Sequence, residues 1–251
     1  MPLSGRKQVG RRTASLACVA ALAAVTAGEA ACAAGPAAIQ LAQTPPSSAE
    51  IARYRALHAA AATGDTAAIQ RLVAVGQADL DGRDGHGRTA LMVAAHGRNH
   101  GAARALIAAG ANVDALDHER YDVLTISGVL DDVEMVKLAL AADADAGLVT
   151  SPYDGTALIA SAHLGHVEVV RALIKAKAPL DLVNNLGWTA LIEAIVLGDG
   201  GARHAEIVRL LIAAGADKDL ADSRGVRPLA LAQNRGYGDI AAILERAGAR
   251  P

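Results

Sequence analysis

Large aromatic side chains are almost absent from this sequence of 251 residues. It contains no phenylalanine, one tryptophan and four tyrosines, although about half of the residues are apolar. Aromatic and β-branched residues favour packed sheets, so the composition argues against an aromatic-rich β-sandwich. A core of alanine, leucine, valine and isoleucine suits helices that stack closely on one another.

Cysteine and excess positive charge are also lacking. The only cysteines, Cys18 and Cys32, lie in the first 32 residues. The rest of the chain therefore has no disulfide framework, cysteine-rich zinc site or nucleophilic cysteine. The formal net charge is −2 and no large basic patch is present, which argues against nucleic acid as a partner.

Residues 1–33 have the pattern of an export signal peptide. Basic residues at positions 6, 7, 11 and 12 precede an apolar stretch at 14–25, and small residues around 27–34 provide cleavage points. The apolar stretch is short for a membrane span. Removing residues 1–33 takes away four basic residues and Glu29, which changes the net charge from −2 to −5. We expect a periplasmic or secreted protein with no stable membrane span after cleavage.

Three other interpretations of this leader stay open. It could be an uncleaved membrane anchor, a lipoprotein signal ending at Cys32, or a twin-arginine signal containing Arg11 and Arg12. The next segment, residues 34–48, contains three prolines and two serines, and we expect it to be a flexible linker.

One leucine position recurs through the remaining residues, 49–251, in steps of 34, 33, 34, 33 and 38. It is occupied by Leu57, Leu91, Leu124, Leu158, Leu191 and Leu229. Three motifs recur in phase with it: Gly-x-Thr-Ala-Leu at 87–91 and 187–191, Gly-His at 165–166, and Gly-Ala-x-x-Asp at 110–114 and 215–219. This pattern resembles the ankyrin repeat. The resemblance implies an all-α solenoid of about six helix-turn-helix repeats after the signal peptide and short linker.

Each motif has a physical role in such a unit. Threonine can cap the first helix, as we expect for Thr89, Thr156 and Thr189. Glycine can end a helix in the left-handed conformation. We expect this after the first helix at Gly64, Gly165, Gly198 and Gly236, and after the second helix at Gly76, Gly110, Gly215 and Gly248.

The two ends of the array are expected to carry polar caps. Ser47 and Glu50 can form a capping box for a long first helix that reaches Ala62, with Glu50, Arg53, Tyr54 and Arg55 on its outer face. At the other end, repeat six carries Gln233, Asn234, Arg235, Glu245 and Arg246.

Repeat three departs most from the pattern. Arg120 and Asp131 replace the two glycines, and Asp122 replaces the threonine. Asp122 can still cap, whereas a left-handed conformation at Arg120 and Asp131 would be strained. We expect local relaxation there; the alternative is a reshaped turn that contacts a ligand.

Repeat five contains five extra residues, 199–203, which we expect to lengthen the turn between its helices. The insertion is either a tolerated surface loop or a specificity loop. Glu193 is also unusual, because every equivalent position in the other repeats is apolar. A buried carboxylate needs a partner, and we expect Glu193 to pair with Arg203 or His204.

No cofactor, catalytic or metal site stands out. The pairs His96 with His100 and His163 with His166 have metal-ligand spacing but no completing carboxylate. The acidic turn at 79–84 misses the calcium-loop spacing, and no nucleophile-base arrangement or dinucleotide fingerprint is recognisable. We expect no enzyme activity.

The resemblance to ankyrin proteins implies binding of a protein partner through turn tips and the concave face of the first helices. Mapped onto this sequence, that surface comprises His118, Tyr121, Tyr153, Asn185, Trp188, Glu193 and Arg203. Exposed rings there would be binding anchors, although Tyr121 and Trp188 could instead pack against adjacent turns. We expect a monomer that acts as a periplasmic scaffold or adaptor. The alternatives are a secreted effector and, less favoured, a metal-binding or enzymatic protein using the 199–204 loop.

Overall fold

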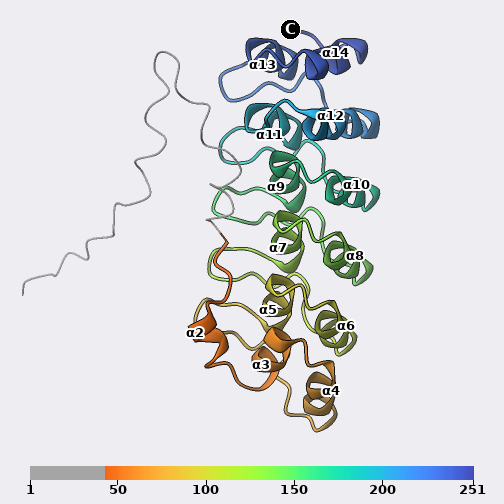
Figure 1. Cartoon of the computed structure of the whole chain (residues 1–251). Coiled ribbons are helices and arrows are strands. Elements are labelled where there is room, and N and C mark those ends of the chain that lie inside the picture. Colours follow the sequence, from red (N-terminus) through yellow and green to blue (C-terminus); the bar gives the residue numbers. More distant parts are fainter. Residues whose placement is uncertain (1–42) are drawn as a thin grey trace, which may run out of the picture. The chain divides into compact units, whose positions relative to one another are not determined.

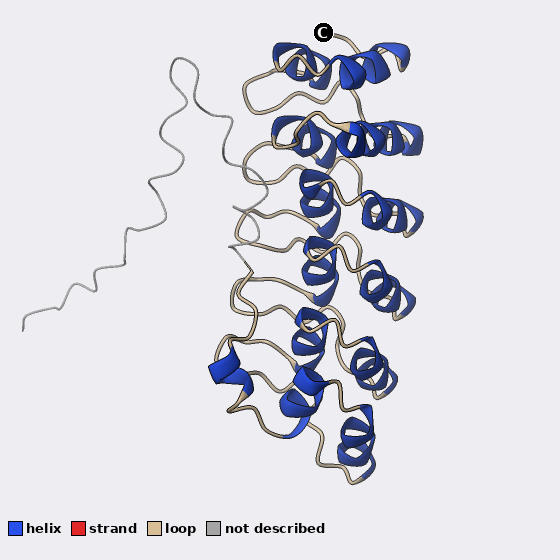
Figure 2. Cartoon of the chain, in the orientation of Figure 1, coloured by secondary structure: helices blue, strands red, loops and turns tan. Residues whose placement is uncertain are grey.

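The computed structural model describes residues 43–251, and within this range it contains helices and loops but no strand (Figure 2). Thr150 and Gly155 form one isolated bridge. The all-α prediction is therefore confirmed for this part of the chain. The predicted leader, and residues 34–42 of the predicted linker, lie outside the described residues.

Six helix pairs follow a four-residue helix, α2 (Ser48–Ile51). They are α3 (Ala56–Thr63) with α4 (Thr66–Ala74), α5 (Ala90–His96) with α6 (His100–Ala108), α7 (Val123–Val129) with α8 (Val133–Ala141), α9 (Ala157–Leu164) with α10 (Val167–Lys175), α11 (Ala190–Val196) with α12 (Ala202–Ala214), and α13 (Pro228–Asn234) with α14 (Gly238–Arg246). We call these pairs repeats 1 to 6. First helices pack against first helices and second helices against second helices of the neighbouring repeat (Figure 1).

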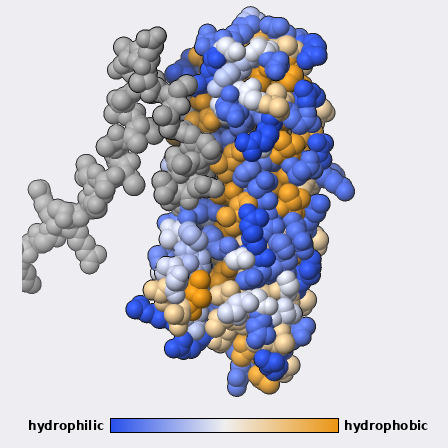
Figure 3. Space-filling view, viewed as in Figure 1, coloured by the Kyte–Doolittle hydropathy of each residue, from blue (hydrophilic) through white to orange (hydrophobic). Residues whose placement is uncertain are grey.

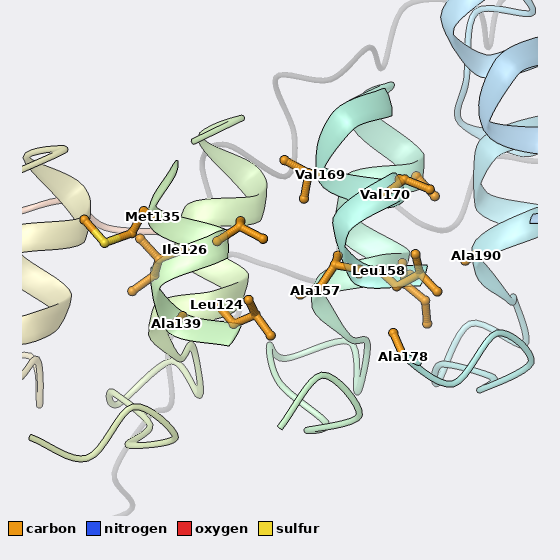
Figure 4. Packing of buried hydrophobic residues seen from close by; sticks show 14 of the residues in the cluster. Leu124, Ile126, Met135, Ala139, Ala157, Leu158, Val169, Val170, Ala178 and Ala190 are labelled. Carbon is orange, nitrogen blue, oxygen red and sulfur yellow. The ribbon is translucent and has the colours of Figure 1, made fainter. Parts of the chain in front are cut away.

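The core is a continuous layer of aliphatic side chains between successive repeats. The recurrent leucine is buried in every repeat, with no member more than 4% exposed. In repeat 4, Val169, Val170 and Leu173 of α10 are fully buried and belong to the same core cluster as Leu158 of α9. Figure 4 shows Val169, Val170 and Leu158 within this layer. A single helix pair could not bury this face alone, so stability depends on neighbouring repeats.

The expected caps are present. The hydroxyls of Thr89, Thr156 and Thr189 accept backbone N–H groups at 3.2–3.3 Å, and all four glycines after the second helices have positive φ. After the first helices, Gly64, Gly165 and Gly236 are left-handed as expected, but Gly198 is not.

Repeat 3 does not relax, contrary to our expectation. Arg120 and Asp131 keep the left-handed conformation, with φ of 64° and 54°. Neighbouring contacts hold Arg120 there: its carbonyl accepts Ser151 N–H at 2.8 Å, and its guanidinium donates to Asp154 at 2.7 Å. Asp122 caps α7 as predicted, accepting Thr125 N–H at 2.7 Å.

The start of repeat 1 also differs from the prediction. The Ser47–Glu50 capping box forms, but α2 ends at Ile51 and α3 begins only at Ala56, so there is no single long helix to Ala62. Arg88 lies beside this break: its fully buried guanidinium donates to Glu50 and to Asp84, and Tyr54 donates to Asp84 at 2.6 Å. Glu50 and Tyr54 therefore face inward rather than forming a polar outer cap.

The last residues of the predicted linker are attached to the same cluster. Gln43 is buried, and the Thr44 carbonyl accepts Arg88 Nη1–H at 2.8 Å. The Thr44 hydroxyl donates to Glu119 at 3.0 Å. Residues 43–48 thus lie against repeats 1 to 3.

Side chains just before or at the start of the second helices join repeats 2, 4, 5 and 6 to the repeat before them. Each donates to a carbonyl at or near the end of the preceding first helix, where the backbone carbonyls are not all bonded within the helix. These bonds run from Asn99 to Ala61 at 2.8 Å, from His166 to Gly128 at 2.8 Å, from His204 to His163 at 2.8 Å, and from Tyr237 to Gly198 at 3.0 Å.

Candidate protein-binding surface

The turns between consecutive repeats, which we call fingers, are joined to one another by backbone hydrogen bonds. These bonds run from His118 N–H to the His86 carbonyl at 2.9 Å, from Ser151 N–H to the Arg120 carbonyl at 2.8 Å, and from Asn185 N–H to the Tyr153 carbonyl at 3.0 Å. The Asn185 amide adds a bond to the Pro152 carbonyl at 3.0 Å. The fingers therefore form a fixed surface rather than independent loops.

Exposed side chains gather on the fingers that precede repeats 4 and 5. Tyr153 is 39% exposed and Val183 is 47% exposed, and these are two of the four exposed large apolar residues among residues 43–251. Asn185 lies beside them and His118 is exposed on an earlier finger. Sequence reasoning missed Val183, because nothing in the pattern distinguishes an exposed loop valine from a buried one.

Two predicted aromatic anchors occupy different environments. Tyr121 is only 2% exposed, and burial raises the pKa of its hydroxyl above the ordinary value. Its predicted role as an exposed anchor is therefore wrong, and the packing alternative holds. Trp188 is half-buried and packs against the core cluster.

Glu193 does not pair with Arg203 or His204, so that prediction is wrong. Its Oε1 accepts the Asn184 amide N–H at 2.8 Å, and its Oε2 lies 3.2 Å from Nδ1 of His163. Glu193 is 3% exposed, and the Asn184 amide is its side-chain hydrogen-bond donor, whereas Glu193 Oε2 and both ring nitrogens of His163 make no hydrogen bond within residues 43–251. The three side chains tie α9, α11 and the finger between them.

The insertion in repeat 5 is packed against the chain on both sides. Its first residues form a tight turn, and Ala202 and Arg203 extend α12 by starting it early. His204 lies between two groups: its Nδ1 is 2.7 Å from Asp199, and its Nε2 donates to the His163 carbonyl at 2.8 Å. Bonds from Gly201 N–H and then His204 lower the pKa of Asp199. Arg203 remains exposed.

The glycines of this turn have different roles from those expected. The left-handed residue is Gly200, with φ of 70°, because the extra residues move the reversal along the chain. Gly198 is needed for space instead: a Cβ there would lie 2.1 Å from the Ala194 carbonyl. The ring of Tyr237 covers Gly200, where a Cβ would lie 2.4 Å from it.

The histidines and acidic turns make structural bonds. His58 contacts the Arg88 carbonyl at 2.9 Å, and His100 contacts Asp132 at 2.8 Å. In the acidic turn, Asp81 accepts Asn112 N–H at 2.9 Å from the next repeat. Among residues 43–251, no three His, Cys, Asp or Glu residues are grouped so that they could hold a metal ion.

A family model decides the classification. The model described as ankyrin repeats (3 copies) matches residues 29–117 and 126–222, which is more than half of the sequence. The chain belongs to the ankyrin repeat family. None of the helices in the described part is both long and apolar enough to cross a bilayer.

Known ankyrin repeat proteins of bacteria resemble this one over most of its length. The ankyrin repeat protein YahD of Escherichia coli (strain K12) is 36% identical over 191 residues, which cover 76% of this chain and 94% of YahD. A solved ankyrin repeat domain from Acinetobacter baumannii AYE is 44% identical with a TM-score of 0.74, covering 77% of this chain and 98% of that domain.

A third similar structure comes from a protein complex. The matched chain belongs to a solved complex of the predatory endopeptidase Bd0816 from Bdellovibrio bacteriovorus with immunity protein Bd3460. The match has 25% identity and a TM-score of 0.65, and it covers 77% of this chain and 98% of that chain.

Proposed function

We propose that this ankyrin repeat protein is a non-catalytic module that binds a protein partner through the fingers that precede repeats 3 to 5. The observation that carries the proposal is the exposure of Tyr153 and Val183 on consecutive fingers that the Asn185 bonds join. Rigid aromatic and aliphatic anchors on a pre-organised surface are what protein interfaces use. Asn185 and His118 add exposed polar groups on these fingers that can orient a partner. Arg203 is exposed at the start of α12, within repeat 5, and lies outside the fingers.

The classification supports a protein as the partner, since ankyrin arrays act in protein recognition and a similar chain occurs in an endopeptidase–immunity protein complex. The site of action is proposed from the leader at residues 1–33: the protein works in the periplasm as a scaffold or adaptor. A secreted effector with the same surface is the second candidate. Fractionation of the producing cell, with and without residues 1–33, separates these locations.

Affinity capture from the exported fraction tests the binding surface. The double variant Tyr153→Ala/Val183→Asp should lose a partner that the wild type retains, because both apolar anchors are removed. Lys175→Ala, an exposed change on α10, should retain it. Equal capture by all three proteins would show that the fingers are not the binding surface.

A further inference from the structure

The two ends of the repeat array differ in chemistry. At the repeat 1 end, α3 and α4 line an open hollow of about 480 Å³. Six apolar residues line it: Ala56, Ala59, Ala60, Ala68, Leu72 and Val75. Val75 is 64% exposed, and Figure 3 shows apolar patches at the lower end of the molecule, where this repeat lies.

The same positions in repeat 2 show what this face is built to contact. Moving 34 residues along the chain gives Ala90, Val93, Ala94, Ala102 and Leu106, which are at most 2% exposed, while Ala109, the equivalent of Val75, is half-buried. They become buried because repeat 1 packs on them. The hollow of repeat 1 is therefore a stacking face of ankyrin type, shaped for another helix pair.

The repeat 6 end lacks such a face. Its exposed side chains are polar, as the sequence predicts, and Gln233 donates to Glu245 at 3.1 Å across α13 and α14. Terminal repeats need polar outer faces for solubility. Of the two ends of a second copy, therefore, only the repeat 1 end carries a matching apolar face.

Two residues of opposite charge line the hollow and can form ion pairs between two copies. Asp65 precedes α4 and Arg71 lies near its end, both are exposed, and neither is in an ion pair within the described residues. A two-fold axis perpendicular to α4 sets the two α4 helices antiparallel. It thereby brings Asp65 of one copy opposite Arg71 of the other, twice.

We propose that two copies of this protein pair head to head through their α3 and α4 faces. The dimer covers the apolar hollow and leaves the fingers of repeats 3 to 5 free. The assembly stops at two copies, because a two-fold (isologous) interface uses the α3 and α4 face of each copy once. This proposal is independent of the binding partner and replaces the expectation of a monomer.

Sedimentation equilibrium of the purified protein tests the pairing. We expect a dimer for the wild type at micromolar concentrations, and at least about tenfold weaker association for Leu72→Glu. Gln233→Glu, at the opposite end, should leave the dimer unchanged. A wild-type monomer at every concentration, or equal weakening by Gln233→Glu, would overturn the proposal.

Charge reversal separates a specific interface from a folding defect. Arg71→Glu should weaken association because the introduced carboxylate would face Asp65 of the other copy. The double variant Asp65→Lys/Arg71→Glu should recover the dimer, since the pair is restored with opposite signs. Failure of this recovery, with circular dichroism showing native helix content, would contradict the proposed arrangement.

Discussion

The imidazole of His163 in α9 lies 3.2 Å from the carboxylate of Glu193 in α11, and each side chain is only 4% exposed. The neighbouring amide of Asn184 donates to the same carboxylate at 2.8 Å. Removing one partner of a buried pair leaves an uncompensated charge, whereas replacing both partners by apolar groups can be neutral. This distinction gives the first prediction.

His163→Leu should lower the free energy of unfolding by about 1–3 kcal/mol, because it removes the imidazole beside the buried Glu193 Oε2, which has no hydrogen-bond partner in the described part of the chain. The double variant His163→Leu/Glu193→Leu should recover most of this loss, since the equivalent position elsewhere is apolar. Urea denaturation measures both. If the double variant is as unstable as the single one, the pair is not the reason for the loss.

The repeated motifs made much of the fold predictable. Threonine caps, the glycines after the second helices and the buried leucine column depend on contacts within one repeat or between identical neighbours. The partner of Glu193 was not predictable in this way. His163 comes from the preceding repeat and Asn184 from the finger, so only three-dimensional stacking brings them together.

Positions where tertiary contacts override local preference were predicted wrongly. Arg120 keeps a left-handed conformation because the next finger holds it. Tyr54 turns inward because it bonds Asp84 beside buried Arg88. For the candidate surface, the sequence located the fingers and Tyr153, but it could not separate buried Tyr121 from exposed Val183.

Core leucines should be among the most sensitive positions. Leu158 and Leu173 are fully buried, so replacing either by alanine should lower the free energy of unfolding by about 2–5 kcal/mol through lost burial and an added cavity. Exposed Lys175→Ala should change it by less than about 0.5 kcal/mol. Chemical denaturation that finds either leucine variant nearly neutral would contradict the stacked core.

Asp122 should make stability depend on pH. Burial raises the pKa of this carboxyl to about 6, above the ordinary value of the unfolded chain. The folded state therefore binds the proton more tightly, and this group's contribution to stability falls as pH rises from about 4 to 6. The pKa values of Glu50 and Asp84 are instead lowered to about 2. The contribution of these two carboxylates to stability is therefore lost as pH falls below about 4.

Asp122→Asn isolates this effect, because asparagine also caps helices. The variant should match the wild type below about pH 4 and exceed it by about 2–3 kcal/mol above pH 6. Parallel stability curves for Asp122→Asn and wild type would disprove the assignment.

Arg88 should hold the segment before repeat 1 in place. Its guanidinium binds Asp84, Glu50 and the Thr44 carbonyl. Arg88→Met should therefore increase amide hydrogen exchange of residues 43–55 by at least about tenfold. Arg83→Met, at an exposed arginine of the same finger, should not. Unchanged protection in Arg88→Met would show that the segment is held by other contacts.

Site-specific photo-crosslinking in the producing cell tests the proposed binding surface most directly. A photoreactive phenylalanine analogue at Tyr153 or Asn185 should give the same discrete crosslinked protein. The analogue at Lys175, on exposed α10, should not. Crosslinks from Lys175 but none from Tyr153 or Asn185 would contradict recognition through the fingers.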